Sequence, residues 1–146
     1  MYKILLATDG SEYSLQSLQK IIPMAKAMQA KLTVLSVAEE IPFLRGTEGM
    51  SQEEFNVLVN SINREAEMGL ERARKLFESA GLKVETMLRA GKSAEVICEE
   101  AENGSFDLIV LGDTGRGGLK ELFLGSVSNK VVHQARTDVM IVKRKN

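Results

Sequence analysis

The sequence predicts an α/β fold in which one open, parallel, doubly wound sheet of five strands carries helices on both faces. Five short apolar runs alternate with four amphipathic segments along 146 residues. The apolar runs lack the polar alternation of a strand with one wet face, so each strand should be covered on both sides, as in parallel sheets. Alternating strands and helices then require right-handed crossovers. We expect a single domain over residues 1–146.

A short turn separates the first strand from the first helix. Residues Tyr2 to Thr8 include four consecutive apolar residues and should form a strand, and Asp9-Gly10-Ser11 should turn the chain. From Ser11 to Gln29 apolar residues recur every three or four positions, which is typical of an amphipathic helix. Pro23 lies inside this segment and is expected to kink it.

The second strand leads through a loop into a long helix. Lys31 to Val37 is rich in residues that favour strands, whereas Ala38 to Met50 has the composition of a loop. Ser51 and Glu54 have the spacing of a capping box, in which each side chain bonds the backbone N–H of the other. The helix should therefore start there and run to about Ser79.

The remaining elements continue the alternation of strand and helix. In order they are a strand from Leu82 to Arg89, a helix from Ser93 to Glu102, a strand from Asp107 to Leu111, a helix from Ser126 to Ala135 and a strand from Val139 to Val142.

The connection from Leu111 to Val127 carries the most distinctive chemistry. It leaves an apolar strand, passes four glycines and enters a helix at Gly125-Ser126. Glycine allows close approach of the backbone to a ligand, and a helix N-terminus offers unpaired N–H groups to an anion. The stretch therefore predicts a phosphate-binding loop. If the first and fourth strands are neighbours, this loop and Asp9-Gly10 face one crevice beyond the carboxyl ends of the strands.

Two common phosphate motifs do not fit the chain. Ala90-Gly91-Lys92-Ser93 resembles the end of a P-loop, but Thr86 stands where the first glycine is required. We interpret Ser93 instead as a helix cap. A dinucleotide-binding fingerprint starting at Gly115 fails as well, because Lys120 occupies the position of its last glycine.

What remains is Gly112-x-x-Gly115, nine residues, and Gly125-Ser126. This spacing resembles the nucleotide-binding members of the universal stress protein family. The resemblance extends over nearly the whole chain, through KILLATDGSEYSLQSL, LTVLSV, DLIVLGDTGRGGLKELFLGSVSNKVV and VMIVKR. It implies a Rossmann-like fold of the adenine nucleotide alpha hydrolase type, with strand order 3-2-1-4-5.

The resemblance also implies a nucleotide site made of ten residues: Thr8, Asp9, Val37, Leu111, Gly112, Gly115, Arg116, Gly125, Ser126 and Val127. In it Asp9 would accept hydrogen bonds from the ribose hydroxyls, and Val37 would offer backbone groups to the adenine edge. Leu111 and Gly112 would lie against the nucleoside, and Gly115, Gly125, Ser126 and Val127 would bind phosphates. Arg116 could clamp the outer phosphates or be a charge that faces solvent.

The function implied by the resemblance is that of an ATP-binding stress-response regulator. ATP with Mg²⁺ would order the loop between Gly112 and Gly125 and so change the surface offered to a protein partner. The resemblance further implies a homodimer in which the last strands, Val139 to Val142, pair.

Asp113 departs from the small polar residue that is usual after the first glycine. A carboxylate near phosphates lowers affinity unless it points to solvent or shares a divalent metal with them. One alternative is therefore a dimeric interaction module that binds no nucleotide. Another is an ATP hydrolase or adenylating enzyme, although the segment TDGSEYS lacks the S-G-G-x-D-S pyrophosphate motif and no general base stands beside the loop.

Composition argues against several other classes of protein. A net charge of -1 and a pI near 5.9 do not suggest nucleic-acid or lipid binding. No apolar run reaches membrane-spanning length, and MYKILLATDG is too strand-like for a signal peptide. Cys98 is the only cysteine and should be a buried, unreactive thiol in a reducing compartment. His133 has no partner at metal-ligand spacing. We expect a cytoplasmic protein.

Overall fold

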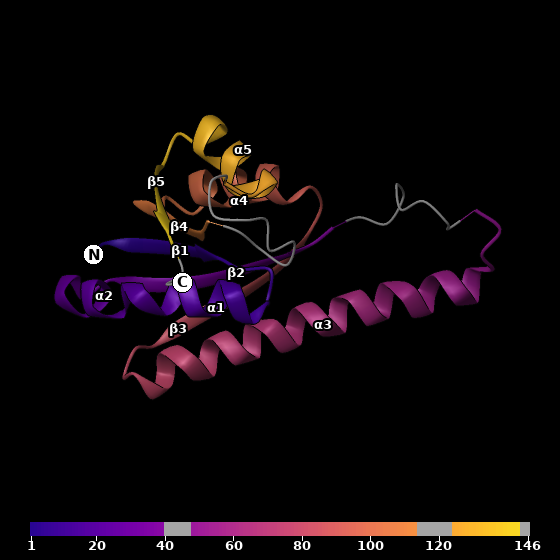
Figure 1. The fold of residues 1–146 in the computed structure, drawn as a ribbon, viewed down its shortest axis with the longest axis horizontal. Helices are drawn as coiled ribbons and strands as arrows, with labels where there is room; N and C mark the ends of the chain where they lie inside the picture. The colour runs from indigo at the N-terminus through magenta and orange to yellow at the C-terminus, as the bar shows by residue number, and fades with distance from the viewer. Residues whose placement is uncertain (40–47, 114–123, 144–146) are drawn as a thin grey trace.

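The computed structural model describes residues 1–39, 48–113 and 124–143, which form an open α/β sheet (Figure 1). All five strands are parallel and their order is β3-β2-β1-β4-β5. The strands are β1 (Lys3–Ala7), β2 (Lys31–Ala38), β3 (Val84–Ala90), β4 (Leu108–Gly112) and β5 (Asp138–Val142). The predicted sheet and its order are confirmed, with strand ends shifted by one or two residues.

Helices cover both faces of the sheet, as predicted (Figure 1). They are α1 (Glu12–Leu18), the 3₁₀ turn η1 (Gln19–Ile21), α2 (Ile22–Met28), α3 (Gln52–Ser79), α4 (Ser93–Asn103) and α5 (Ser126–Gln134). Helices α1, α2 and α3 pack on one face, and α4 and α5 pack on the other. No helix within the described residues is long and apolar enough to cross a membrane.

The alternation of side chains along β1 explains the two layers. Ile4 and Leu6 point into a core that they share with Phe77 of α3, whereas Leu5 points into the opposite core with Ile97 of α4. All five side chains are 3% exposed or less. Each face of the strand thus buries large apolar groups, which is why the apolar runs of the sequence are continuous rather than alternating.

The first helical segment is divided instead of merely kinked. Helix α1 ends at Leu18, and a 3₁₀ turn precedes α2, whose first turn contains Pro23. A proline has no N–H to donate and is tolerated in a first helical turn, so the division occurs just before it. In contrast, the capping box of α3 forms as predicted: Glu54 N donates to Ser51 Oγ at 3.1 Å, and Ser51 N donates to Glu54 Oε2 at 2.9 Å.

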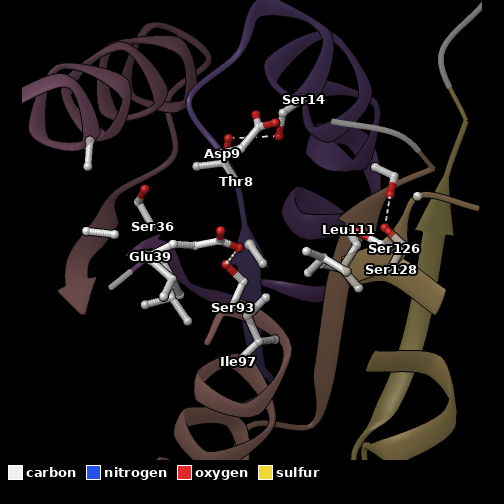
Figure 2. Close-up of a pocket in the computed structure, with 18 of the residues that line it drawn as sticks. Thr8, Asp9, Ser14, Ser36, Glu39, Ser93, Ile97, Leu111, Ser126 and Ser128 are labelled. Carbon is white, nitrogen blue, oxygen red and sulfur yellow. Dashed lines mark hydrogen bonds between the residues drawn. The ribbon is translucent and has the colours of Figure 1, made fainter. Parts of the chain in front are cut away.

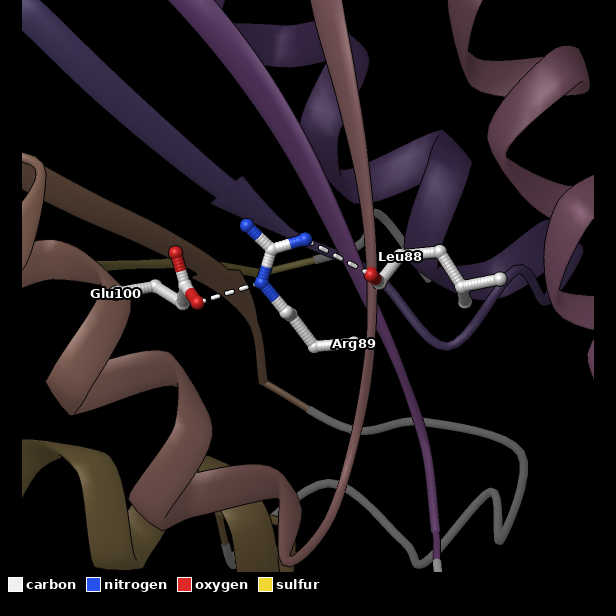
Figure 3. A network of polar contacts seen from close by, with 3 residues as sticks. All are labelled: Leu88, Arg89 and Glu100. Atoms are coloured by element: carbon white, nitrogen blue, oxygen red, sulfur yellow. Dashed lines mark hydrogen bonds and ion pairs between the residues drawn. The ribbon is translucent and has the colours of Figure 1, made fainter.

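Arg89 fastens the edge strand β3 to helix α4 (Figure 3). Its Nε lies 2.6 Å from Glu100 Oε1, and its Nη1 donates to the Leu88 carbonyl at 3.0 Å. The Glu100 side chain is only 22% exposed, so this ion pair is less screened than an ordinary surface pair. The contact helps to fix α4, whose N-terminus lines the cavity described next.

Candidate functional site

A cavity of about 500 Å³ opens beyond the carboxyl ends of β1, β2 and β4 (Figure 2). The chain leaves β1 toward β2 on one side, while β4 lies on the other, so the cavity occupies the point where the strand order reverses. Eight of the ten expected site residues line it: Thr8, Asp9, Val37, Leu111, Gly112, Gly125, Ser126 and Val127. Gly115 and Arg116 lie outside the described residues.

The turn after β1 is held by its own side chains. Thr8 is buried, and its hydroxyl lies 2.8 Å from Ser14 Oγ and accepts the Gly10 N–H at 3.0 Å. Asp9 Oδ1 accepts the N–H of Ser11 at 2.8 Å. These bonds orient the exposed Asp9 carboxylate at the rim of the cavity. A carboxylate so placed can accept hydrogen bonds from the hydroxyls of a ligand.

The opposite wall joins β4 to α5 through the backbone of Asp113. Its N–H donates to the Val142 carbonyl at 3.2 Å, and its carbonyl accepts the Gly125 N–H at 2.7 Å. Ser128, buried in the first turn of α5, donates its hydroxyl to the Gly112 carbonyl at 2.8 Å. Both ends of the glycine-rich connection, residues 113 and 125, are therefore fixed next to each other.

Helix α5 begins at Ser126 with Gly125 as its N-cap, and the described structure shows no side chain capping it. The first N–H groups of a helix have no partner within the helix, and its dipole places partial positive charge there. Gly125, Ser126 and Val127 line the cavity, and the Gly125 N–H is already bonded to the Asp113 carbonyl. The N–H groups that can bind an anion inside the cavity are therefore those of Ser126 and Val127.

Residues of two further helices complete the cavity, and the sequence did not predict that these residues line it. Ile62, Glu65 and Ala66 of α3 line one side, and Ser93 and Ile97 of α4 line another. Neither group lies in a glycine-rich motif. Only the heptad-like spacing of apolar residues in α3 could have indicated which of its faces meets the sheet.

The prediction that Ser93 caps α4 is wrong. The N-cap is Lys92, and Ser93 is already the first helical residue. Its hydroxyl instead donates to Glu39 Oε1 at 3.1 Å, inside the cavity. A side chain at the first helical position no longer points back over the helix end, which leaves it free to bond a neighbouring element.

The other singled-out residues stand apart from the cavity. Cys98 is half-buried; burial raises the pKa of its thiol, and the nearby Glu102 and Glu99 carboxylates raise it further. The neutral thiol that results supports the expectation of an unreactive cysteine. His133 is exposed on α5. Within residues 1–39, 48–113 and 124–143, no three histidine, cysteine or acidic side chains gather as a metal site would require.

The fold and the cavity together define a Rossmann-like α/β protein with a cavity at the topological switch point of its sheet. The sequence model of the universal stress protein family matches residues 1–143. The chain belongs to the universal stress protein family.

Relatives match over most of their length. Universal stress protein YxiE of Bacillus subtilis is 34% identical over 145 residues, covering 97% of this chain and 98% of YxiE. Universal stress protein MJ0531 of Methanocaldococcus jannaschii is 34% identical over 143 residues, covering 97% of this chain and 82% of MJ0531.

Solved structures share the fold. That of MJ0577, from the same archaeon, superposes with a TM-score of 0.76 at 33% identity and covers 99% of this chain and 97% of its own. A universal stress protein solved in complex with cAMP superposes with a TM-score of 0.67 at 26% identity, covering 99% of this chain and 98% of its own.

Proposed function

We propose that this protein binds an adenine nucleotide in the cavity and acts as a nucleotide-dependent stress-response regulator, with ATP and Mg²⁺ as its ligands. The observation that carries the proposal is the uncapped N-terminus of α5 facing the Asp9 carboxylate across one cavity. The related protein in complex with cAMP, an adenine nucleotide, supports it. The cavity volume of about 500 Å³ lies in the range of small-molecule sites.

Charge sets the direction in which a nucleotide lies. Its phosphates would lie at the start of α5, where Ser126 and Val127 offer N–H groups. Gly125, whose N–H is bonded to the Asp113 carbonyl, would let the phosphates approach the backbone closely. Its ribose lies over the end of β1, within reach of Asp9. The base then lies beyond the end of β2, against Val37. Neighbouring strands are about 4.8 Å apart, so the path from β4 across β1 to β2 spans roughly 10 Å, the scale of a nucleoside.

The rest of the proposed site follows the same polarity. Thr8 would hold the turn that carries Asp9, while Leu111 and Gly112 would lie against the nucleoside. Gly115 would make the first phosphate contacts, and Arg116 would meet the outer phosphates. Because the described residues contain no cluster of metal ligands, Mg²⁺ would be bound chiefly by the phosphates. When bound, the ion neutralises phosphate charge, and Asp113 is the carboxylate that could share it.

Nucleotide binding would regulate the protein by changing the surface that it offers to partners. Nucleotide in the cavity contacts both ends of the connection from Gly112 to Gly125, so binding changes what that connection presents to a protein partner. Strand β5 forms one edge of the sheet, and we propose that Val139 to Val142 pair with the same strand of a second copy to give a homodimer. A single half-buried cysteine suits the reducing cytoplasm.

Calorimetry with AMP, ADP and ATP, each with and without Mg²⁺, tests the proposal, and denaturing the purified protein identifies any nucleotide that it carries. We expect ATP to bind to the parent and to bind more weakly to Asp9→Asn and to Gly125→Val. Ser79→Ala, at the far end of α3, serves as a control. Absence of both heat and a thermal shift with every nucleotide would contradict the proposal. Sedimentation of a monomer at high protein concentration would contradict the dimer.

A further inference from the structure

Glu39 and Ser93 form a polar pair inside the cavity that the phosphate and ribose contacts do not use. Glu39 follows β2 directly and Ser93 begins α4, and the Ser93 hydroxyl donates to Glu39 Oε1 at 3.1 Å. Figure 2 shows the pair between Ile97 and the Thr8 turn, away from Ser126 and Ser128. The pair therefore lies apart from the start of α5.

Backbone contacts keep the pair in place. The Gly91 N–H donates to the Ala38 carbonyl at 3.1 Å, which holds the turn before α4 against the end of β2. Helix α4 packs on the sheet through the buried side chain of Ile97, which is 3% exposed. The ion pair between Arg89 and Glu100 also holds this helix to β3. The positions of Glu39 and Ser93 are thus set by the fold before any ligand arrives.

The surroundings of the pair suit a planar base. Ile97 lies beside the pair, and Val37, Ile62 and Ala66 contribute further apolar surface to the same cavity. A base can pack on such surface, whereas a phosphate would lose hydration there and meet the negative charge of Glu39. The same charge disfavours a carbonyl oxygen and favours a hydrogen-bond donor on the edge of the base.

The acceptor capacity of Glu39 exceeds what Ser93 uses. A carboxylate offers about four acceptor positions on its two oxygens, and the Ser93 hydroxyl occupies one of them. The exocyclic amino group of a base is an N–H donor at the edge of the ring. Ser93 acts on the base through Glu39 and is a positioning residue.

We propose that Glu39, held by Ser93, accepts a hydrogen bond from the exocyclic amino group of the bound base and so selects amino-substituted bases. The proposal rests on the proposed nucleotide site. A hydrogen bond to a charged group is worth about 1.5–3 kcal/mol, and Glu39 is exposed, so the effect should lie at the low end, about tenfold in affinity.

Calorimetry with AMP and with purine riboside 5′-monophosphate, which lacks only the 6-amino group, tests the proposal. We expect the parent to bind AMP about tenfold more tightly than the purine ligand, because only AMP can donate the hydrogen bond to Glu39. In Glu39→Ala the ratio between the two affinities should fall severalfold through weaker AMP binding, with binding of the purine ligand little changed. Ser93→Ala should reduce the ratio partly, because Glu39 remains but is less well held.

Glu65→Ala is the matched control, since it removes another carboxylate from the lining of the cavity. It should leave the ratio between the two ligands unchanged. An unchanged ratio in Glu39→Ala, or a ratio lost in Glu65→Ala instead, would overturn the assignment to Glu39. Failure of both ligands to bind the parent would overturn the nucleotide site itself, which is a different result.

Discussion

Gly10 and Gly69 touch through their backbones, although 59 positions separate them in the chain. A Cβ atom added to Gly69 would lie 2.7 Å from the Gly10 Cα, and one added to Gly10 would lie 3.1 Å from the Gly69 Cα. Arg72 reinforces the contact, because its Nη2 donates to the Gly10 carbonyl at 2.9 Å. Helix α3 therefore positions the turn that carries Asp9 and also lines the cavity with Ile62.

We expect Gly69→Ala to lower the free energy of unfolding by about 1–2 kcal/mol. In an exposed helix the same change would raise it by up to about 1 kcal/mol, so the sign is diagnostic. Here the added methyl group overlaps the backbone of Gly10, and such overpacking typically costs about 1–3 kcal/mol. Urea unfolding measures the change. Met68→Ala, next to it on the exposed side, should change stability by less than about 0.5 kcal/mol.

Nucleotide affinity gives the second measurement on Gly69→Ala. If α3 sets the position of the turn, the variant should bind ATP more weakly even where it is fully folded, while Met68→Ala binds it like the parent. A Gly69→Ala variant as stable as the parent would show that the two backbones separate at little cost.

Ser128 and Ser126, two residues apart on α5, should separate stability from binding. Ser128 is 7% exposed and bonds the Gly112 carbonyl, so Ser128→Ala should lower the free energy of unfolding by about 1 kcal/mol. Ser126 is exposed at the helix start, so Ser126→Ala should leave stability nearly unchanged and weaken ATP binding about three- to tenfold. Thermal unfolding and calorimetry on the same two variants check this; equal effects of both on stability would contradict it.

The sheet could be predicted from sequence because its determinants are local and repetitive. The consecutive apolar residues Ile4, Leu5 and Leu6 predict a strand buried on both faces, and this prediction needs no information from other parts of the chain. A cavity is expected beyond the carboxyl ends of such strands, which is how Asp9 could be singled out, whereas Gly125 could be singled out because it precedes a helix.

The parts of the site that escaped prediction depend on contacts between distant segments. Glu39 and Ser93 are 54 positions apart, and their hydrogen bond exists because the turn before α4 meets the end of β2. Gly69 looks like an unfavourable residue in a helix until Gly10 is placed against it. A motif describes one segment at a time, so it cannot contain such pairs.

Cys98 should react slowly with iodoacetamide at pH 7.5. Burial raises the pKa of its thiol, and the carboxylates of Glu102 and then Glu99 raise this pKa further. The pKa therefore lies above the ordinary cysteine value of about 8.5, and little reactive thiolate is present at pH 7.5. Removing a neighbouring negative charge lowers that pKa; Glu102→Gln should therefore speed the reaction at a given pH. Glu95→Gln, on the same helix, should not. Mass spectrometry follows the rate, and labelling of the parent as fast as glutathione would refute the expectation.

Asp113 decides between a nucleotide-binding protein and an interaction module with an unused cavity. Both backbone groups of Asp113 are hydrogen-bonded: its N–H donates to the Val142 carbonyl, and its carbonyl accepts the Gly125 N–H. The side chain therefore starts beside the helix end where we propose the phosphates lie. Its negative charge should oppose those of ATP, and more so than the fewer charges of AMP.

Asp113→Asn keeps the shape of the side chain and removes its charge. In a buffer with a chelator we expect this variant to bind ATP about three- to tenfold more tightly than the parent, for a change of order 1 kcal/mol in charge repulsion. Excess Mg²⁺ should narrow the difference, because the ion neutralises phosphate charge and the carboxylate can share it.

Asp138→Asn is the control, because Asp138 lies at the amino end of β5 and so at the opposite end of the sheet. This variant should bind ATP like the parent. Calorimetry at fixed ionic strength measures the parent and both variants, each with the chelator and with excess Mg²⁺. If only Asp113→Asn binds ATP, and the parent binds none under any condition, the natural chain is an interaction module whose phosphate site is closed by one carboxylate. If Asp113→Asn binds ATP no more tightly than the parent in the chelator, the Asp113 side chain does not lie near the phosphates. The phosphates would then be bound by the start of α5 without interference from this carboxylate.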